Sequence, residues 1–531
     1  MTGRSSGRVL PRELGEWAER IADHARAETL DFYQTIFEVL AAEQVDQVAA
    51  YGGFPQRYPH WRFGMEYEKL RKQHSYGLGK IYEMVINNDP CYAYLMNDNA
   101  LVDQKTVMAH VYGHCDFFKN NIWFGQTNRK MMDEMANHAT RVRRYIERRG
   151  IDKVERFIDT CLALENLIDP HSAFMRRQPV RRRTSEHEDR RKQEQPNLTR
   201  YPAKSYMDRY INPPAEIERE RKAHEQSLEK SKGIVPEKPL RDVLLFLLDN
   251  APLEDWQADI LSIIREEAYY FAPQGQTKIM NEGWASYWHS TIMTNYCLRD
   301  DELLHYCDHH SGTLATSPGR LNPYKMGIEL FRDIERRWNT GRHGLEYDRC
   351  EDMHKRRHWE EYHPSGWTPP NGRVVGRESP GREKIFEVRR IYNDVTFLDE
   401  FLTPEFVDEQ KLYHYRFDPA TRRMVVVSRD FDKIRQQLLF MLTNHAQPYI
   451  YVVDGNYRNR GELYLAQKHC GADLEIKFST ETLREVQRIW KRPVHLHARI
   501  DDDYILFTYD GHQSTQQHID EALPKPAHRV E

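Results

Sequence analysis

Hydrophobic residues recur at helical spacing over most of the first 404 positions of the chain. Near the start, Trp17, Ile21 and Ala25 mark one face of a helix. Gly150 is a natural end for another helix. The period predicts helices at about residues 127–150, 153–167, 240–248, 255–271, 277–296 and 326–338. We therefore expect residues 11–170 to be helical and the large N-terminal part of the chain to be mainly α.

A different pattern begins near residue 405. Short runs rich in Val, Ile and Tyr are separated by turn signals such as Asp454-Gly455 and Asp510-Gly511. These runs predict strands at residues 413–417, 424–428, 449–453, 462–466, 494–500 and 503–508. Helical spacing lies between them at residues 432–444 and 479–491. Residues 405–531 are thus predicted to form a small α/β domain with a polar tail.

A charge-dense segment at residues 176–237 interrupts the helical part. It opens on Arg181-Arg182-Arg183 and is almost wholly polar at residues 186–195, so it lacks the apolar surface to order itself independently. Its basic start suits RNA or acidic partners, but a solvated charged segment is the stronger interpretation. The predicted organisation is a helical domain at 1–175, a linker or insertion at 176–237, a second helical domain at 238–404 and the α/β domain.

Charge and composition narrow the function classes. The formal net charge of -4 gives no sign of a nucleic-acid partner or an anionic membrane surface. The most apolar short run, residues 243–248, is too short to span a bilayer, and no signal peptide is apparent. The seven cysteines are scattered without a CxxC pair, which argues against a disulfide framework or a cysteine zinc site. We expect a cytoplasmic protein and leave its oligomeric state open.

The most informative chemical feature is a pair of histidines four residues apart, His110 and His114. Asp103 is a suitable N-cap for the helix that would carry them. Four residues advance about 400° on a helix, so both rings leave one face and can bind one metal ion. Zinc peptidases use this spacing as HExxH, but Val111 stands here in place of the general-base glutamate. With 25 histidines in the chain, the pair alone is a weak signal.

The segment Asn281-Glu282-Gly283-Trp284-Ala285 strengthens the signal. It is similar to the Asn-Glu-Gly-aromatic-Ala segment that supplies the third, carboxylate ligand in gluzincin-type aminopeptidases. The resemblance implies a gluzincin-like helical core in which His110, His114 and Glu282 hold one metal ion with a position open to water. Zinc is the expected metal, with iron or manganese as alternatives, since two histidines and a carboxylate also suit Fe(II). Alternatively, Glu282 is a helix N-terminal carboxylate or an ion-pair partner.

Three further residues are candidates for the catalytic base that Val111 cannot supply. His289 follows Glu282 by two helical turns and is a candidate fourth ligand, a general acid or base, or a hydrogen-bond donor to one of the ligands. Alternatively, it is a core residue whose hydrogen bonds are satisfied within the protein. Glu266 and Glu267 lie on the preceding predicted helix and reach the metal if the two helices pack together. Pairing with Arg265 is the alternative for these two carboxylates. Two other patterns, Glu134 with His138 on a charged helix and His495 with His497 on a predicted strand, are better explained by solvated surface positions.

Segments along most of the chain resemble the stage V sporulation protein R (SpoVR) family. They are residues 77–85 (GLGKIYEMV), 110–121 (HVYGHCDFFKNN), 210–214 (YINPP), 245–256 (LFLLDNAPLEDW), 265–289, 321–325 (LNPYK) and 474–500. The resemblance implies a link to formation of the spore-cortex peptidoglycan or to stress response. It also implies a serine protein kinase and a second associated protein as partners. It brings no established catalytic residues.

These observations support different classes of function. The first is a metal-dependent hydrolase of amide or peptide bonds, with His110, His114 and Glu282 as ligands and with Glu266, Glu267 or His289 as base. The second is a non-catalytic regulator or scaffold that acts with the kinase. A third, a non-haem iron or manganese protein, follows from the same ligand set. The sequence leaves the choice, and the substrate, open.

Overall fold

The computed structural model describes residues 10–75, 84–175, 207, 210, 213, 218–219, 235–363 and 374–524. The charged segment at 176–237 therefore falls largely outside the described residues, as do most of the motifs at 77–85 and 210–214. The chain divides into two compact units. Unit 1 comprises Met1–Phe157 and Glu266–Gln447, and unit 2 comprises Ile158–Arg265 and Pro448–Glu531. The domain boundaries expected from composition remain predictions.

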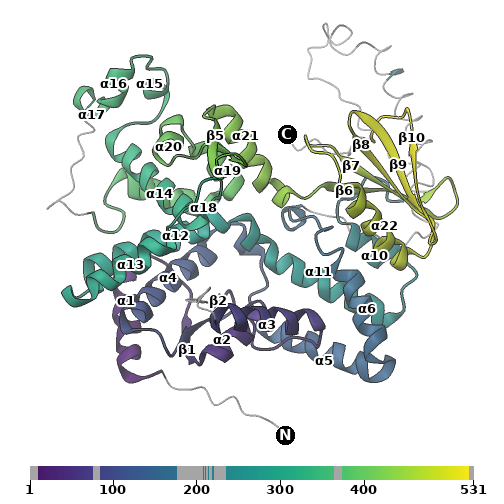
Figure 1. Cartoon of the computed structure of the whole chain (residues 1–531), viewed down its shortest axis with the longest axis horizontal. Helices are drawn as coiled ribbons and strands as arrows, with labels where there is room; N and C mark the ends of the chain where they lie inside the picture. Colours follow the sequence, from purple (N-terminus) through teal and green to yellow (C-terminus); the bar gives the residue numbers. More distant parts are fainter. Residues whose placement is uncertain are drawn as a thin grey trace. The chain divides into compact units, whose positions relative to one another are not determined.

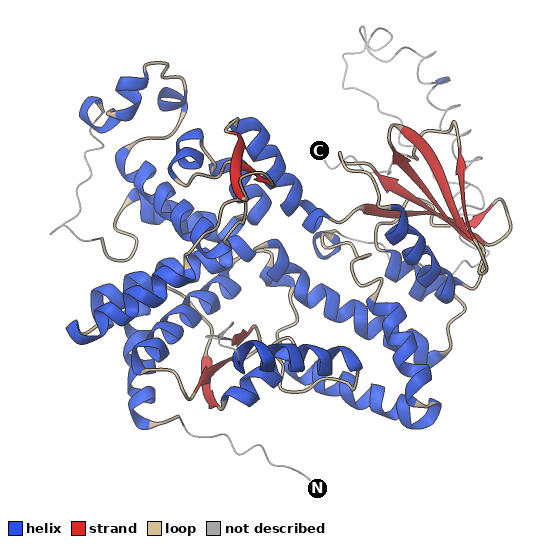
Figure 2. Ribbon diagram, in the orientation of Figure 1, coloured by secondary structure: helices blue, strands red, loops and turns tan. Residues whose placement is uncertain are grey.

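Unit 1 is mainly helical, as the periodicity predicted (Figures 1 and 2). Its centre is a pair of packed helices, α4 (Leu101–Asn120) and α12 (Lys278–Ile292), flanked by α1 (Arg12–Ala27), α14 (Pro323–Thr340) and α18 (Pro380–Ile391). The other helices with residues in this unit are α2 (Ala42–Ala50), α3 (Trp61–Ser75), α5 (Met131–Arg149), α6 (Ile151–Leu162), α11 (Asp255–Gln276), α13 (Leu303–Thr313), α15 (Leu345–Asp348), α16 (Met353–Arg357), α17 (Trp359–Tyr362), α19 (Asp394–Phe401), α20 (Pro404–Glu409) and α21 (Phe431–Leu442). Helices α6 and α11 each continue into unit 2.

A small sheet interrupts the part that we expected to be wholly helical. Strands β1 (Thr35–Leu40), β3 (Cys91–Met96) and β2 (Met84–Ile86) lie side by side in that order, with β1 parallel and β2 antiparallel to β3. The prediction of helix at these positions was wrong. Almost every residue of β3 is buried, so the strand has no alternation of polar and apolar positions by which sequence could distinguish it from helix.

The start of α4 also differs from the prediction. The helix begins at Leu101, with Ala100 as the preceding residue, and Asp103 lies within the first turn. Asp103 is therefore not the N-cap. A carboxylate in the first turn still interacts favourably with the positive end of the helix.

Glycines allow α4, α12 and α14 to approach closely. A Cβ atom on Gly113 of α4 would lie 2.8 Å from the Cα of Ala285 on α12. On the other side of α12, a Cβ on Gly283 would lie 2.4 Å from the backbone of Gly327 on α14. Both contacts are too short for any side chain, so the glycines set the helix spacing. The Gly-x-Ala part of the segment 281–285 is thus explained by packing.

Helix α12 is buried on all sides, yet it carries several polar residues. Trp284 and Trp288 are fully buried in the core of unit 1, next to Phe331 and Phe386. The polar residues Asn281, Glu282, Ser286 and His289 are buried on the same helix. Buried polar groups are costly unless other groups satisfy them, so their partners indicate why they are there.

The sheet of unit 2 contains the four strands expected between residues 449 and 508, together with β10 (Ser514–His518), which the sequence did not predict. Its order is β10, β9 (Asp503–Tyr509), β8 (Val494–Ile500), β7 (Glu462–Lys468) and β6 (Tyr449–Tyr457). Only the β7–β8 pair is parallel. Helix α22 (Ile476–Trp490) packs on β8 and β9, and α10 (Val243–Asn250) packs on β6. The hairpin of β4 (His414–Asp418) and β5 (Arg423–Ser428) is a separate sheet and belongs to unit 1.

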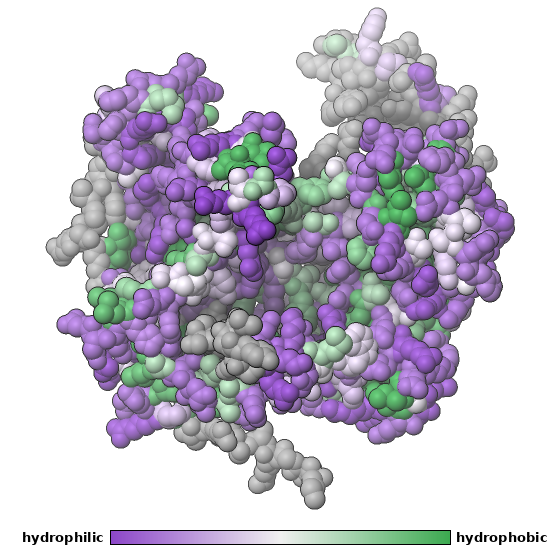
Figure 3. All heavy atoms as spheres, in the orientation of Figure 1, coloured by the Kyte–Doolittle hydropathy of each residue, from purple (hydrophilic) through white to green (hydrophobic). Residues whose placement is uncertain are grey.

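The surface agrees with the polar composition. The face drawn in Figure 3 is mostly hydrophilic, and its hydrophobic residues gather in separate patches. None of the helices in the described part of the chain is both long and apolar enough to cross a membrane.

Candidate metal centre

His110 and His114 lie on the buried face of α4, where both rings point toward α12. Only 3% of His110 and 4% of His114 is exposed, and the ring centroids are 4.6 Å apart at a near-perpendicular angle. Glu282 on α12 is equally buried, with 5% exposed. The structure therefore brings together all three residues that the sequence predicted as metal ligands.

The distances within this triad of His110, His114 and Glu282 resemble those of a coordination shell. The Nε2 atoms of His110 and His114 each lie 3.5 Å from the same Glu282 Oε2. Good hydrogen bonds are shorter, at about 2.7–3.2 Å. Ligands at 2.0–2.2 Å around a tetrahedral zinc ion are separated by about 3.3–3.6 Å. Glu282 Oε2 is buried and makes no hydrogen bond within the described part of the chain, as a ligand atom aimed at a cation would.

Each histidine of the triad is held through its other ring nitrogen. His114 Nδ1 lies 2.8 Å from Asn281 Oδ1, which can only accept a hydrogen bond. His114 therefore carries its proton on Nδ1 and directs the Nε2 lone pair toward Glu282. His110 Nδ1 lies 2.7 Å from His289 Nδ1, and His289 Nε2 lies 3.1 Å from His310 Nδ1. Such partners fix the orientation of ligand histidines in metal sites.

The triad is connected to the surface through Lys278. The ammonium group of Lys278 donates to Glu282 Oε1, one helical turn away, and 55% of the lysine side chain is exposed. The ring centroid of Tyr324 lies 5.9 Å from this ammonium group. The same ring lies 6.2 Å from the ring centroid of His110. Lys278 and Tyr324 therefore border the site. Neither was predicted as a site residue, although both lie in segments that resemble the SpoVR family, 265–289 and 321–325.

Electrostatics favours a charged carboxylate at Glu282 and a neutral imidazole at His289. Burial raises the pKa of Glu282, but the neighbouring His110, His114 and Lys278 outweigh it, and the pKa lies well below its ordinary value. Burial, together with the nearby His110 and His310, lowers the pKa of His289 well below its ordinary value. An ionised carboxylate is the form that binds a divalent metal ion.

Residues outside the triad fix the ends of α4 and α12. Asp394 accepts from the backbone N–H groups of Ile279 and Met280 at 2.8 and 2.9 Å, which anchors the first turn of α12. Burial raises the pKa of Asp394 to about 7, despite these hydrogen bonds. Asp116, fully buried on α4, accepts from Trp284 Nε1 at 2.8 Å and pairs with Arg389 at 3.3 Å. Asp116 and Trp284 lie in the segments 110–121 and 281–285, whereas their partner Arg389 and the anchor Asp394 lie outside every segment singled out in the sequence.

The predicted bases Glu266 and Glu267 are engaged elsewhere. Glu267 is buried and forms an ion pair with Arg57 at 2.6 Å, and it lies 3.2 Å from His138 Nδ1. Glu266 Oε2 lies 3.4 Å from His138 Nε2. The structure thus groups both carboxylates with His138, whereas it places His289 directly behind His110. His138 is fully buried, so its assignment to a solvated helix face was wrong.

The pair His495 and His497 was likewise assigned to the surface, and this assignment was also wrong. Both rings are buried in the sheet of unit 2. His495 lies 2.9 Å from Glu462, and His497 lies 2.8 Å from the hydroxyl of Tyr464. The alternation of side chains along β8 places His495 and His497 on one face of the sheet. Only the three-dimensional structure shows that this face is buried.

Comparison with known proteins identifies relatives by sequence. No solved structure matches the chain, so a gluzincin-like core has no structural relative to support it. The chain is 29% identical over 507 residues to the uncharacterized protein YcgB of Escherichia coli (strain K12), and the match covers 91% of each protein. The model described as SpoVR like protein matches residues 9–447. The chain therefore belongs to the SpoVR family.

Proposed function

We propose that His110, His114 and Glu282 bind one zinc ion and that the protein uses it to hydrolyse an amide or peptide bond. The observation that supports this proposal best is the pair of 3.5 Å distances from two buried imidazole nitrogens to one carboxylate oxygen. A hydrogen-bonded cluster would close to shorter distances, whereas a coordination shell requires about this spacing. Iron or manganese remains the alternative metal for the same ligands.

The bound metal would polarise a substrate carbonyl and acidify a water molecule. The residues of the chain prepare the site for this role. Glu282 supplies the negative charge that offsets the cation, and Asn281 holds His114 in the tautomer that presents Nε2. Lys278 and Tyr324 border the triad, and both carry protons that can be donated to a leaving group.

His289 fits a positioning role better than that of a base or a fourth ligand. With His110 Nε2 directed at the carboxylate, His110 Nδ1 donates to His289 Nδ1, and His289 Nε2 then donates to His310. Both nitrogens of His289 are engaged, so neither can take a proton from water. Among the predicted bases, Glu266 and Glu267 pair with His138 and Arg57, and we assign no general base to this chain.

Metal analysis of the purified protein tests the first step. The wild type is expected to hold zinc at the triad, and His110→Ala, His114→Ala or Glu282→Gln should each remove about one equivalent. His495→Ala is the matched control, because it removes another buried histidine that contacts a carboxylate and belongs to no three-ligand group within the described residues. A wild-type protein that takes up no transition metal at the triad, or triad variants that keep the full complement, would overturn the proposal.

Activity assays test the second step. Peptidoglycan precursors and peptides are the substrate classes to assay with zinc-loaded protein, with Glu282→Gln as the inactive reference. Cleavage that Glu282→Gln retains would exclude the triad as its source. Metal binding without cleavage of any amide would refute the hydrolase assignment while leaving the metal site in place.

A second candidate function follows from the replacement of the zincin glutamate by valine. Val111, at the position of the zincin glutamate, is fully buried, which leaves the metal ligands without the carboxylate that drives this chemistry in zinc peptidases. This observation favours a regulator or scaffold, acting with a serine protein kinase, in which the metal only stabilises α4 against α12. In that case Glu282→Gln should lower both the stability of the protein and its binding to the kinase. Neither the wild type nor the variant should cleave an amide bond.

A further inference from the structure

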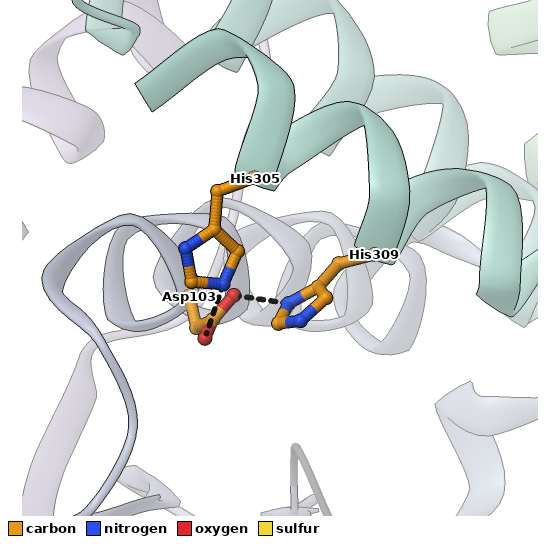
Figure 4. A group of neighbouring side chains, drawn as sticks. All are labelled: Asp103, His305 and His309. Carbon is orange, nitrogen blue, oxygen red and sulfur yellow. Dashed lines mark hydrogen bonds and ion pairs between the residues drawn. The ribbon is translucent and has the colours of Figure 1, made fainter. Parts of the chain in front are cut away.

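A second group of possible ligands lies at the other end of α4. Asp103, in the first turn of α4, faces His305 and His309, which leave α13 one helical turn apart (Figure 4). His309 Nδ1 lies 2.5 Å from Asp103 Oδ1, and His305 Nε2 lies 3.6 Å from Asp103 Oδ2. The two rings are perpendicular, with centroids 4.4 Å apart, and one ligand atom from each residue lies within 4.8 Å of the others.

We propose that Asp103, His305 and His309 form a second, independent binding site for a divalent transition-metal ion. Two imidazoles and one carboxylate suit zinc, cobalt, nickel or copper, and they do not suit calcium or magnesium, which prefer oxygen ligands. Of the side chains, 44% of His305, 33% of His309 and 11% of Asp103 is exposed. The ion would therefore complete its coordination with water and exchange with solvent.

The simpler alternative is an ion-paired cluster without a metal. The 3.6 Å separation from His305 to Asp103 fits the edge of a coordination shell, about 3.3–3.6 Å. The 2.5 Å separation between His309 Nδ1 and Asp103 Oδ1 fits a hydrogen bond. Metal binding must therefore displace the proton of this hydrogen bond and rotate the carboxylate of Asp103. A half-exposed pair contributes little to stability by itself. Two histidines of one helix that converge on one carboxylate form the kind of ligand set that a transition-metal site requires.

The position of the cluster makes it separate from the triad. Asp103 precedes His110 by seven residues, which is about 10 Å along a helix. Metal ions that act jointly on a substrate lie about 3.5–4 Å apart. The second ion would instead hold α13 against α4. The buried ion pair between Lys105 of α4 and Glu302, the residue that precedes α13, joins the same two helices nearby. His310, the next residue of α13, would be held against His289 as a consequence.

The inference does not depend on the proposed function, and metal titration of the full chain can separate the two. Metal-free protein is titrated with Zn²⁺ and with Co²⁺, and bound equivalents and visible absorption are recorded. We expect two equivalents in the wild type. The double variant His305→Ala, His309→Ala should lose one of them, and His110→Ala, His114→Ala should lose the other. Asp103→Asn, which keeps both rings, should weaken the second equivalent at least about 10-fold.

The matched control is another histidine pair at the same spacing. His354 and His358 have ring centroids 4.7 Å apart, but they form no three-ligand group within the described residues. His354→Ala, His358→Ala should leave both equivalents unchanged. Melting curves without metal establish that every variant folds, and Zn²⁺ should raise the melting temperature less for the His305, His309 variant than for the wild type.

Three results would overturn the second site. In the first, the wild type binds metal only at the triad. In the second, the His305→Ala, His309→Ala variant still binds two equivalents of metal. In the third, the Asp103→Asn variant binds both equivalents as tightly as the wild type. If the one equivalent found depends instead on His305 and His309, the triad proposal fails and the second site stands.

Discussion

At the scale of single residues, the second nitrogen of each histidine decides its role. His114 donates to Asn281, and His110 contacts His289, so each turns the opposite nitrogen toward Glu282. His138 follows Glu134 by the same four-residue step on α5. Its two ring nitrogens, however, face Glu266 and Glu267. The surroundings of the ring, more than its spacing along the helix, distinguish a possible ligand from an ion-pair partner.

Asn281 offers a direct test of this view. Replacing Asn281 with Ala removes the acceptor at 2.8 Å and frees His114 to rotate or to change tautomer. We expect affinity for zinc at the triad to fall about 10–100-fold, as loss of an outer hydrogen-bond partner usually does. Competition with a chromogenic chelator measures the change. An affinity equal to that of the wild type would show that Asn281 does not orient a ligand.

His138 gives a prediction about pH. Burial lowers the pKa of His138, but the hydrogen bonds to Glu266 and Glu267 outweigh it and raise the pKa above its ordinary value. The folded protein therefore favours the imidazolium form. The stability gained is fully present below about pH 6.5, the ordinary value, and is lost as the pH rises through the raised pKa.

The variant His138→Gln removes this titration while keeping one donor. At pH 6 we expect the free energy of unfolding to fall by about 1–3 kcal/mol relative to the wild type, and by less at pH 8. Urea unfolding at both pH values measures the difference. A difference that grows as the pH rises would contradict the assigned direction.

At the scale of elements, the triad depends on the close approach of α4 and α12. Gly113 lies between the two histidines and opposite Ala285, so a methyl group there must push the helices apart. Asp394 holds the first turn of α12 from a third element. Small shifts between the two helices would lengthen the distances from both histidines to Glu282 at once.

Gly113→Ala is therefore expected to destabilise unit 1 by about 1–3 kcal/mol, the usual cost of overpacking, and to weaken metal binding. Gly64→Ala is the matched control, because Gly64 is also helical and a Cβ there meets nothing within 4 Å. Alanine at position 64 should stabilise α3 slightly, since it favours helix more than glycine. Thermal melts and zinc titrations of both variants test this contrast, and equal effects would refute it.

At the scale of the whole molecule, the two units are each built from segments distant in sequence. Unit 1 closes only when Glu266–Gln447 joins Met1–Phe157, and its core includes Ile434 and Leu438 from α21. In unit 2, α10 lies against the C-terminal part, where Phe246 packs on Trp490 and the ring of Tyr449 lies under Arg241. Neither unit is a continuous stretch that can be cut out at one point.

Two truncations distinguish this arrangement from the boundary expected at residue 404. A chain ending at residue 447 should keep a folded unit 1 and its metal sites, while α10 becomes sensitive to protease because its apolar face is uncovered. A chain ending at residue 404 also loses α21, so it should lose metal binding as well. Limited proteolysis and metal content measure both outcomes. Equal behaviour of the two truncated chains would contradict the prediction.

Sequence predicted the elements whose signal is local. The helices around residues 12–27 and 131–149 and the strands of the C-terminal sheet follow from hydrophobic spacing and from turn residues, which depend only on near neighbours. It failed for β3, whose buried residues show no alternation, and for the buried rings of His138, His495 and His497. Burial is set by what packs on a face, and that information is not local.

The sequence by itself determined the family, the helical character and the common face of His110 and His114, because a four-residue step on a helix fixes direction. It also pointed to Glu282, through a resemblance between short segments. Only the tertiary structure decided that Glu282 lies between the two rings, that His289 stands behind His110, and that Glu266 and Glu267 turn to His138 and Arg57. These contacts join residues far apart in the chain, and their geometry arises from helix packing.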